Sequence, residues 1–314
     1  MLSTALVIER PEHLSFRDLP LPPPGEDQVV VAVEWSGIST GTERLLYTGR
    51  MPPFPGMGYP LIPGYEAVGR IVEAGSRSGR AIGERVFIAG ARCFEGIHHL
   101  FGATASHLVV PGSRAFPLAP HVRADGVLLA LAATAYHAGW GQGATPPQLI
   151  VGHGALGRLI ARIAVALAPE SPPTVWEVNP SRQAGAVGYS VVHPDADPRR
   201  DYAAICDASG DIRILDSLIQ RLAPGREVTL AGFYHTAITF DFIPAFLREI
   251  RLRIAAEWKP DDLARVVQLV NAGTLALDGI ITHERPARAA IDAYPVAFDD
   301  PDCVKMILDW REAA

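Results

Sequence analysis

The stretch Gln148-Leu149-Ile150-Val151-Gly152-His153-Gly154-Ala155-Leu156-Gly157 decides the fold. It places a short apolar run directly before a GxGxxG loop, and a helical pattern rich in Leu, Ile and Ala continues to Leu167. In a strand-loop-helix unit the first glycine makes the tight turn, the second lets the backbone approach a pyrophosphate, and the third lets helix and strand pack closely. The pyrophosphate then lies at the positive end of the helix. We therefore expect a dinucleotide-binding loop formed by Gly152, Gly154, Ala155, Leu156 and Gly157.

A second apolar run, Thr174 to Val178, contains Glu177, which lies 25 residues beyond Gly152. The usual spacing is about twenty, and a Pro-rich loop between the two accounts for the excess. A carboxylate here accepts hydrogen bonds from the ribose hydroxyls of NAD and repels the extra phosphate of NADP, which favours NAD. Arg182 nearby keeps NADP open as the alternative. His153 is interpreted as a loop residue rather than a catalytic base.

Strands and helices alternate beyond the loop, which predicts a doubly wound parallel sheet. The predicted strands lie at 148–151, 174–178, 202–208, 227–233 and 251–255, and the predicted helices at 127–140, 156–167, 212–222, 242–249 and 261–271. Ligands of such sheets bind beyond the carboxyl ends of the strands. We therefore expect Asp207 and Gly232, which lie at two of these ends, to line the cofactor site.

The chain before about residue 120 follows a different pattern of short alternating or apolar runs between Pro and Gly clusters, as at 28–35, 67–74, 85–89 and 107–110. This pattern predicts a β-barrel or sandwich. The C-terminal tail mixes a predicted strand at 279–283, a helix at 287–298 and a strand at 304–308. The fold class is therefore α/β, and 314 residues suffice for two domains of ordinary size.

Composition and charge exclude several classes of function. The net charge of -6 and the lack of a basic run argue against nucleic acid as a partner. Cys93, Cys206 and Cys303 are far apart in the sequence and show no CxxC spacing, which favours a reducing, cytoplasmic compartment over a disulfide framework. The longest apolar stretch, 127–135, is too short for a transmembrane segment, and the N-terminus resembles a first strand rather than a signal peptide.

Four segments resemble the medium-chain alcohol dehydrogenase family. They are Ser36 to Glu43 (SGISTGTE), Gly64 to Gly69 (GYEAVG), Ala133 to Ala138 (ATAYHA) and Ala276 to His283 (ALDGIITH). The resemblance covers nearly the whole chain and implies a GroES-like β-barrel catalytic domain at 1–122 and 259–314, with a Rossmann dinucleotide-binding domain at 123–258. It also implies oxidoreduction with a nicotinamide cofactor. Family members are often dimeric through the edge of the Rossmann sheet, and the apolar residues of Phe240 to Ile250 permit a homodimer here.

The sequence departs from the zinc-binding members of that family at every expected ligand except one. Their signatures read GICGSD or GICGTD and then GHE, whereas here Ser39 or Thr40 replaces the first Cys and Tyr65 replaces the His. The carboxylate remains, as Glu66, and the other Cys position falls near Ala130. The four-cysteine lobe of a structural zinc is missing too. A tetrahedral zinc site needs three or four protein ligands, so we predict no metal.

Within this family, the stretch from Ser36 to Gly75, with its segment Gly49 to Pro60 (GRMPPFPGMGYP), looks like the bacteriochlorophyllide dehydrogenases of bacteriochlorophyll synthesis. That resemblance implies oxidation, with NAD, of the 3-(1-hydroxyethyl) group on ring A of bacteriochlorophyllide a to an acetyl group. The small-molecule substrate is then a chlorin pigment. Met and aromatic side chains suit a flat apolar molecule. Candidate substrate contacts are therefore Met51, Phe54, Met57 and Tyr59, unless this loop merely folds onto its own barrel.

Alcohol oxidation without a metal needs a general base or relay that takes the hydroxyl proton while the carbinol carbon loses hydride. By resemblance, Thr42 matches the relay hydroxyl of the family, and Tyr65 and Glu66 stand where zinc would lie. We expect Tyr65 or Thr42 to contact the substrate hydroxyl and Glu66 to organise them. The alternative for Glu66 is a structural role.

Two other functions stay open. A zinc-free quinone or enoyl reductase would use NADPH to reduce a double bond, so a preference for NADPH would favour it. A non-catalytic nucleotide-binding protein would bind NAD tightly without hydride transfer.

Overall fold

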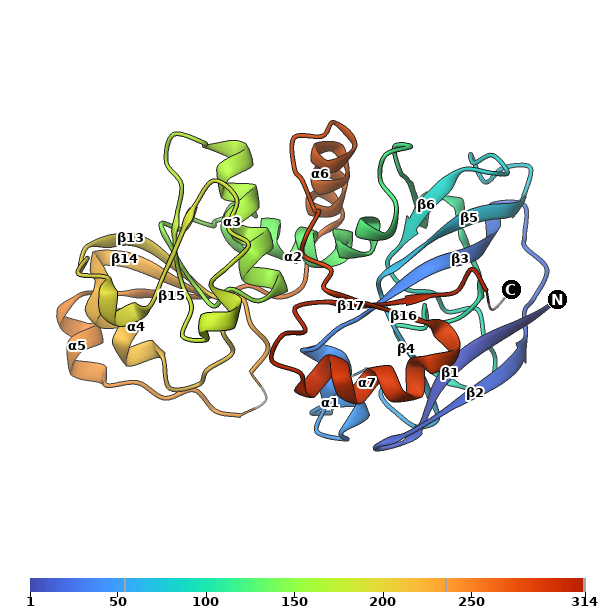
Figure 1. Ribbon diagram of the computed structural model, residues 1–314, viewed down its shortest axis with the longest axis horizontal. Helices are drawn as coiled ribbons and strands as arrows, with labels where there is room; N and C mark the ends of the chain where they lie inside the picture. Colours follow the sequence, from blue (N-terminus) through green and yellow to red (C-terminus); the bar gives the residue numbers. More distant parts are fainter. Residues whose placement is uncertain (54, 235, 313–314) are drawn as a thin grey trace. The chain divides into compact units, whose positions relative to one another are not determined.

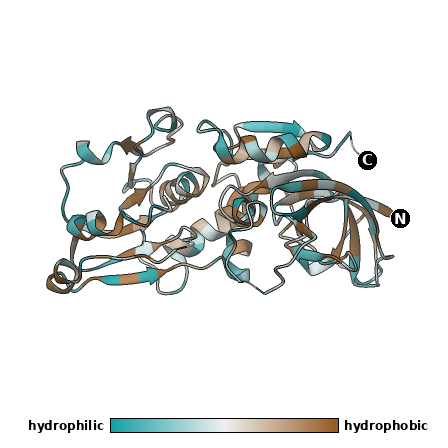
Figure 2. Cartoon of the chain, turned by 90° about the horizontal axis from the view of Figure 1, so that it is seen from below, coloured by the Kyte–Doolittle hydropathy of each residue, from teal (hydrophilic) through white to brown (hydrophobic). Residues whose placement is uncertain are grey.

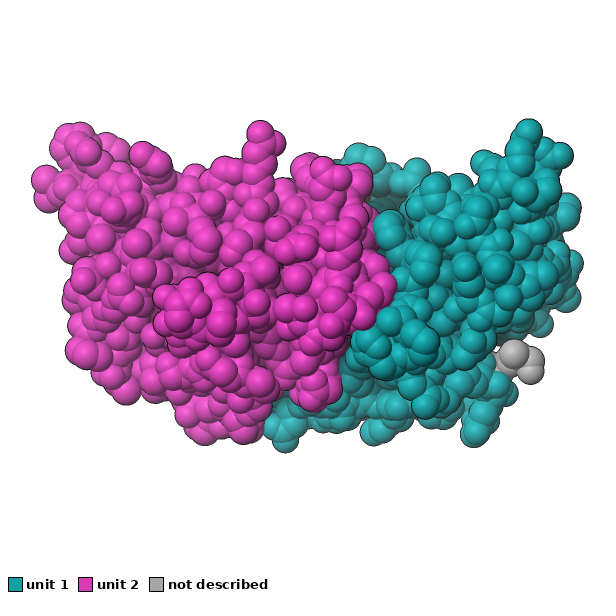
Figure 3. Space-filling model, turned by 90° about the horizontal axis from the view of Figure 1, so that it is seen from above, with its two compact units in different colours: residues 1–130, 280–314 teal, residues 131–279 magenta. Residues whose placement is uncertain are grey.

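The computed structural model describes residues 1–53, 55–234 and 236–312. Its contacts divide the chain into two compact units, Met1–Ala130 with Ile280–Ala314 (unit 1) and Leu131–Gly279 (unit 2), which Figure 3 colours separately. The sequence places these boundaries at 122/123 and 258/259, so α6 (Pro260–Asn271) is the main difference. Asp262 of α6 hydrogen-bonds to His137 of α2 (Leu129–Trp140) at 2.8 Å, which ties this helix to unit 2.

Unit 1 contains two sheets, built largely from antiparallel pairs, as its alternating sequence predicts. The first has the order β2-β1-β4-β7, with β1 (Leu2–Arg10), β2 (His13–Pro20), β4 (Leu61–Pro63) and β7 (His98–Leu100). The second has the order β16-β17-β3-β5-β6-β9, with β8 paired to β3. Its strands are β3 (Gln28–Ile38), β5 (Ala67–Ala74), β6 (Arg85–Ile88), β8 (His107–Pro111), β9 (Ala115–Pro117), β16 (His283–Pro286) and β17 (Met306–Asp309). The C-terminal tail thus completes the barrel, because β17 pairs with β3.

The strand expected at 279–283 is wrong in its position. β16 begins only at His283, because Gly279 lies in a turn with a φ of 70° and Ile280 is fully buried before the strand starts. Helix α7 (Ala290–Asp299) follows, and Figure 1 shows it beside α1 (Thr42–Tyr47). Tyr47 of α1 packs on Phe298 of α7, with 5.6 Å between ring centroids. Residues far apart in the sequence therefore meet at this pair of helices.

Unit 2 is built on a parallel sheet with the order β12-β11-β10-β13-β14-β15. Its strands are β10 (Leu149–Val151), β11 (Thr174–Trp176), β12 (Ser190–Val192), β13 (Tyr202–Asp207), β14 (Leu222–Leu230) and β15 (Arg251–Ile254). The chain passes outward from β10 through β11 and β12, and then outward on the other side through β13, β14 and β15. This reversal makes the sheet doubly wound and defines a ligand-binding position beyond the carboxyl ends of β10 and β13.

The helices of unit 2 are α2, α3 (Ala155–Leu167), α4 (Leu215–Arg221), α5 (Phe242–Leu247) and α6. The expected helix 127–140 is α2 preceded by a 3₁₀ turn at Ala124–Leu128. Hydrophobic strands occur in both units (Figure 2), and central strands such as β3 and β10 are mostly buried, whereas the edge strands β2, β15 and β16 are mostly exposed or half-buried. Within the described residues, no helix combines the length and the hydrophobicity that crossing a bilayer demands.

Candidate active site

The glycine loop has the geometry that its sequence predicts. Gly152 adopts a φ of 94°, a conformation that favours glycine. A Cβ atom added at Gly157 would overlap the carbonyl oxygen of Gly152, so helix α3 and strand β10 pack too closely for any side chain there. Gly154 precedes α3 without a side-chain cap, and nothing lies within 4 Å of the Cβ it lacks. This open helix N-terminus fits a bound pyrophosphate.

Glu177 lies directly after β11 and contacts the glycine loop. Its carboxylate accepts hydrogen bonds from the backbone N–H groups of His153 (2.9 Å) and Asn179 (2.8 Å), and only 8% of the residue is exposed. These bonds fix the carboxylate beside the glycine loop.

His153 is a buried structural residue of the loop. One ring nitrogen bonds to the carbonyl of Arg182 (2.6 Å) and the other to the hydroxyl of Tyr189 (2.8 Å). Burial lowers the pKa of His153, which favours the neutral ring. Arg158 of α3 donates to the carbonyls of His153, Arg182 and Ala184. The segment that carries Arg182 is therefore fastened to the glycine loop.

Asp207 ends β13 beside Val151 of β10, at the point where the sheet reverses. It is fully buried, and its carboxylate accepts hydrogen bonds from Ser209 and from the hydroxyl of Tyr234 (2.5 Å). Gly232 lies beyond the end of β14, and a Cβ atom added there would lie 3.3 Å from the Tyr234 ring. Asp207 thus links the segments that follow β13 and β14, and burial raises the pKa of its carboxyl group.

A hydroxyl cluster of Ser39, Thr42 and Tyr65 lies in unit 1. The Tyr65 hydroxyl donates to Ser39 Oγ at 2.6 Å, and Thr42 also hydrogen-bonds to Tyr65. Thr42 and Tyr65 are half-buried, whereas Ser39 is buried. Burial, followed by the charge of Glu66, raises the pKa of Tyr65. Two of the three predicted catalytic residues are thus brought together.

Glu66, the third predicted catalytic residue, is held in a buried ion pair. Lys305 lies directly before β17, and its Nζ donates to Glu66 Oε2. Both side chains are almost completely buried. A Cβ atom added at Gly37 of β3 would overlap the same carboxylate oxygen. This packing favours a structural or organising role for Glu66 over direct contact with a substrate.

Sequence reasoning missed the second buried carboxylate, Glu43. It lies on α1, is 0% exposed, and accepts a hydrogen bond of 2.6 Å from the hydroxyl of Tyr294 on α7. Burial, opposed by this bond, raises the pKa of Glu43 to about 7. Its place directly after Thr42 in the GTE segment was a signal, but Tyr294 and Lys305 carry no local pattern that connects them to it.

The segment of the candidate substrate contacts folds onto the barrel. Met51, Met57 and Tyr59 pack against a small apolar cluster that includes Leu46 and Leu61, and the Tyr59 hydroxyl donates to the Leu46 carbonyl at 2.5 Å. Their side chains remain partly exposed. The geometry accommodates both interpretations of this loop. Phe54, the fourth candidate, lies outside the described residues.

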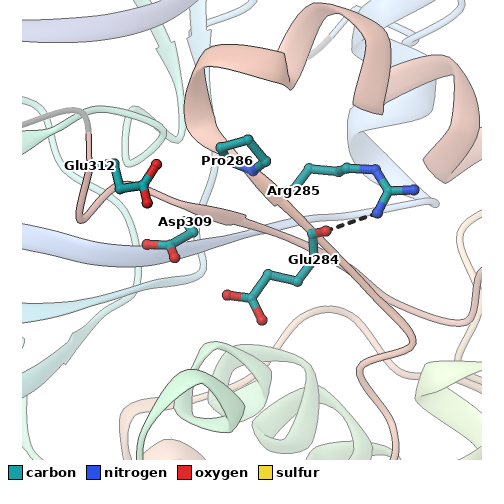
Figure 4. Close-up of a pocket in the computed structure, with 5 residues that line it drawn as sticks. All are labelled: Glu284, Arg285, Pro286, Asp309 and Glu312. Carbon is teal, nitrogen blue, oxygen red and sulfur yellow. Dashed lines mark hydrogen bonds between the residues drawn. The ribbon is translucent and has the colours of Figure 1, made fainter.

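A pocket in unit 1 is separate from all of these groups. Figure 4 shows its lining residues, Glu284, Arg285, Pro286, Asp309 and Glu312. Asp309 pairs with Arg311 at 2.6 Å, and Glu284 lies 3.9 Å from the same guanidinium. Its acidic charges are thus largely compensated, and it contains none of the predicted site residues.

The side chains of the barrel decide whether zinc could be bound there. Within the described residues, no group of three or more His, Cys, Asp or Glu side chains is arranged to hold a metal ion. The position of the usual zinc ligands contains Ser39, Thr40 and Tyr65, whose hydroxyls are poor zinc ligands beside thiolate and imidazole. Independence from zinc stays a prediction.

A barrel joined to a Rossmann sheet with a glycine loop defines the medium-chain dehydrogenases as a class. Residues 25–120 match the alcohol dehydrogenase GroES-like domain family. A crystal structure of a short chain alcohol dehydrogenase from Escherichia coli CFT073, complexed with NADH, superimposes with a TM-score of 0.82 at 20% identity, covering 98% of this chain and 99% of that chain. This likeness confirms the expected fold.

Two relatives match along their whole length. The 2-desacetyl-2-hydroxyethyl bacteriochlorophyllide A dehydrogenases of Cereibacter sphaeroides and Rhodobacter capsulatus are each 52% identical, over 319 and 314 aligned residues, and the alignments cover 100% of this chain and of each relative. The chain belongs to this family of bacteriochlorophyllide dehydrogenases. The resemblance inferred from residues 36–75 is thereby confirmed.

Proposed function

We propose that this protein oxidises the 3-(1-hydroxyethyl) group of bacteriochlorophyllide a to an acetyl group in bacteriochlorophyll synthesis, with NAD and without zinc. The 52% identity over full length to two dehydrogenases named for this substrate carries the proposal. The glycine loop and the hydroxyl cluster supply the groups that such an alcohol dehydrogenase needs.

The dinucleotide is bound by unit 2 in this proposal. The N-terminus of α3, opened by Gly154, receives the pyrophosphate, and Gly152, Ala155, Leu156 and Gly157 shape the loop. Glu177 accepts the ribose hydroxyls and its charge disfavours the phosphate of NADP, which supports NAD. Arg182 lies near Glu177 in the sequence, and its positive charge would attract the phosphate of NADP, which is why the test below compares the two cofactors.

In this proposal, the alcohol is oxidised between the hydroxyl cluster and the nicotinamide. When bound, the nicotinamide supplies the acceptor for a hydride from the carbinol carbon. Tyr65 or Thr42 contacts the substrate hydroxyl. Glu66, held in place by its ion pair with Lys305, organises the hydroxyl cluster. The carbinol carbon adjoins a conjugated macrocycle, so hydride loss demands less of the protein. Asp207 and Gly232 shape the rim of the cofactor site, and Met51, Met57 and Tyr59 offer apolar surface to the pigment.

Location and assembly complete the proposal. All three cysteines are free, which agrees with a reducing cytoplasmic compartment. A homodimer through the edge of the Rossmann sheet is supported by an exposed apolar surface on α5 and on the edge strand β15. Its residues are Phe242, Ile243, Phe246, Leu247, Leu252 and Ile254, each at least 42% exposed.

The test mixes the purified protein with hydroxyethyl-bearing bacteriochlorophyllide a and either NAD or NADP, with and without a metal chelator, and follows the red absorption band of the pigment. We expect the band to shift with NAD and the shift to persist under chelation. A shift abolished by chelator refutes zinc independence. Faster turnover with NADP refutes the cofactor preference, and binding of NAD without any shift refutes the substrate.

A further inference from the structure

The crossover from β11 to β12, residues 177–189, is described in full and contains no α-helix. Parallel strands are usually joined by a helix that packs on the sheet, but here the loop contains only the 3₁₀ turn Pro180–Arg182. Residues 184–188 are all exposed, so apolar packing does little to fix this segment. The segment nevertheless begins with Glu177, the carboxylate that the proposed function places against the ribose hydroxyls. Its position therefore depends on hydrogen bonds to the rest of unit 2.

His153 of the glycine loop fixes the segment 177–189 at three points. Its backbone N–H donates to the Glu177 carboxylate at 2.9 Å, and its ring nitrogens bond to the Arg182 carbonyl at 2.6 Å and the Tyr189 hydroxyl at 2.8 Å. Because a carbonyl only accepts, Nδ1 carries the ring hydrogen, and Nε2 of the neutral ring accepts from the Tyr189 hydroxyl. Burial lowers the pKa of His153 and so favours this neutral form. The residue is 0% exposed, so water does not compete for these bonds.

Arg158 of α3 holds the middle of the same segment. Its guanidinium donates to the carbonyls of Arg182 at 3.2 Å and Ala184 at 2.9 Å. It also lies against the backbone of Gly185, where an added Cβ atom would overlap it. His153, in contrast, reaches the beginning, the middle and the end of the segment. Loss of its ring should therefore free the end and loosen the middle, while Arg158 keeps the chain from opening completely.

Discrimination between NAD and NADP depends on how firmly Glu177 is held. Its carboxylate repels the extra phosphate of NADP only while it stays beside the ribose, because a side chain free to turn away would relieve the repulsion. Both carboxylate oxygens accept backbone N–H groups, from His153 and Asn179, and the Glu177 carbonyl accepts from the Gln183 side chain at 2.9 Å. Gln183 follows directly after Arg182, whose carbonyl the His153 ring holds. A printed series of contacts thus connects the ring to Glu177.

We propose that His153 is a positioning residue that sets the preference of this protein for NAD over NADP. Its ring holds the segment 177–189 against the glycine loop and thereby keeps the Glu177 carboxylate directed at the ribose. The ring does this without contacting the cofactor. This inference rests on the proposed binding of NAD by unit 2 and names the residue on which its selectivity depends.

The test measures the dissociation constants of NADH and NADPH through the fluorescence of the reduced nicotinamide, with no pigment present. Wild-type protein should bind NADH more tightly. His153→Ala removes both ring bonds, and we expect the ratio of the two constants to change about tenfold in favour of NADPH, roughly the effect of one lost hydrogen bond. His153→Asn keeps a side-chain N–H that can donate to the Arg182 carbonyl, so it should restore most of the preference. Tyr189→Phe removes only the bond at the end of the segment and should have an intermediate effect.

Two controls separate positioning from general loosening of unit 2. His137→Ala removes the hydrogen bond between α2 and Asp262, in the same unit, and should leave the ratio unchanged. In a Glu177→Gln background, His153→Ala should change the ratio little further, because His153 acts through that carboxylate.

A ratio unchanged in His153→Ala overturns the proposal, and an unchanged ratio in Tyr189→Phe does so if His153→Ala fails to fold. An equal change in His137→Ala, or a full effect of His153→Ala beside Glu177→Gln, overturns it as well. None of these results affects pigment oxidation as the proposed function. A wild-type protein that binds NADH but oxidises no pigment refutes that function and leaves the role of His153 standing. A wild-type preference for NADPH refutes both the proposed cofactor and this inference.

Discussion

The ion pair of Lys305 with Glu66 is the clearest place to separate structure from catalysis. Lys305→Met keeps a long unbranched side chain but removes the ammonium, which leaves Glu66 1% exposed and without its cation. Glu66 Oε1 already has no hydrogen-bond partner within the described residues, so Oε2 would lose its own as well. Breaking a buried pair in this way costs about 3–5 kcal/mol, which is a large part of the stability of an ordinary domain.

The second change is Glu66→Gln in the same chain. The double variant contains no buried charge at this position, and an uncharged pair of similar volume is often as stable as the ion pair it replaces. We therefore expect most of the stability lost in Lys305→Met to return. Hydrogen exchange of the β17 and β3 amides measures this directly, because it reports the opening of unit 1 separately from unit 2.

Two results would refute this reasoning. If Lys305→Met costs less than about 1 kcal/mol, solvent or another group compensates Glu66, and the pair is not the buried contact described. If the double variant is no more stable than Lys305→Met, the ammonium stabilises the barrel by some means other than Glu66. Where the double variant folds and still oxidises the pigment, Glu66 has a structural role; where it folds but is inactive, Glu66 organises the reacting groups.

Three further predictions concern other residues. Because burial raises the folded-state pKa of Glu43 from 4.5 to about 7, this carboxyl ionises at lower pH in the unfolded chain, and the free energy of unfolding falls as pH rises between these values, by about 3 kcal/mol in total. Urea unfolding of Glu43→Gln should lack this fall, and the same fall in both proteins would assign it to another group. Gly157→Ala should lower both the melting temperature and the NAD affinity because its Cβ overlaps the Gly152 carbonyl, whereas Gly154→Ala should weaken NAD binding alone because its Cβ meets open space. Equal melting temperatures for the two variants would contradict the close packing of α3 on β10. Glu177→Gln should reduce the preference for NAD over NADP by about tenfold or more, measured as the ratio of kcat/KM values, and an unchanged ratio would remove the carboxylate from cofactor choice.

The positions of the glycine loop, Glu177 and Asp207 could be predicted from the sequence because their signals are local. The glycine loop, the strand before it and the helix after it are adjacent in the chain, and Glu177 and Asp207 are found by counting to the ends of the next strands. In a parallel sheet these ends meet at one edge, so a one-dimensional pattern fixes a three-dimensional position. His153 was also interpreted correctly as a loop residue, although its bond to Tyr189 could not be foreseen.

The barrel half could be predicted only in part because its contacts are distant in sequence. Glu66 and Lys305 are 239 residues apart, and Glu43 and Tyr294 are 251 apart. The tail that supplies Lys305 joins the barrel through β17, whose pairing with β3 depends on long-range register rather than on a local motif. The misplaced strand at 279–283 has the same origin. Its apolar residues suit a strand, but Gly279 turns there and the pairing with β17 begins at His283.

The charges of the barrel constrain how an alcohol can be oxidised there. Lys305 is buried and engaged with Glu66, so it is not free to stabilise the oxygen of a substrate from which the proton is leaving. In the proposed site, the groups near the reacting hydroxyl are the neutral hydroxyls of Tyr65, Thr42 and Ser39, which stabilise a partial charge far less than a divalent metal would. Proton and hydride loss must therefore be closely coupled, so that little negative charge develops on oxygen. A carbinol carbon attached to a conjugated macrocycle suits this requirement, because the macrocycle delocalises the positive charge that hydride loss creates. The arrangement of the barrel and the pigment substrate of the family thus support each other on chemical grounds.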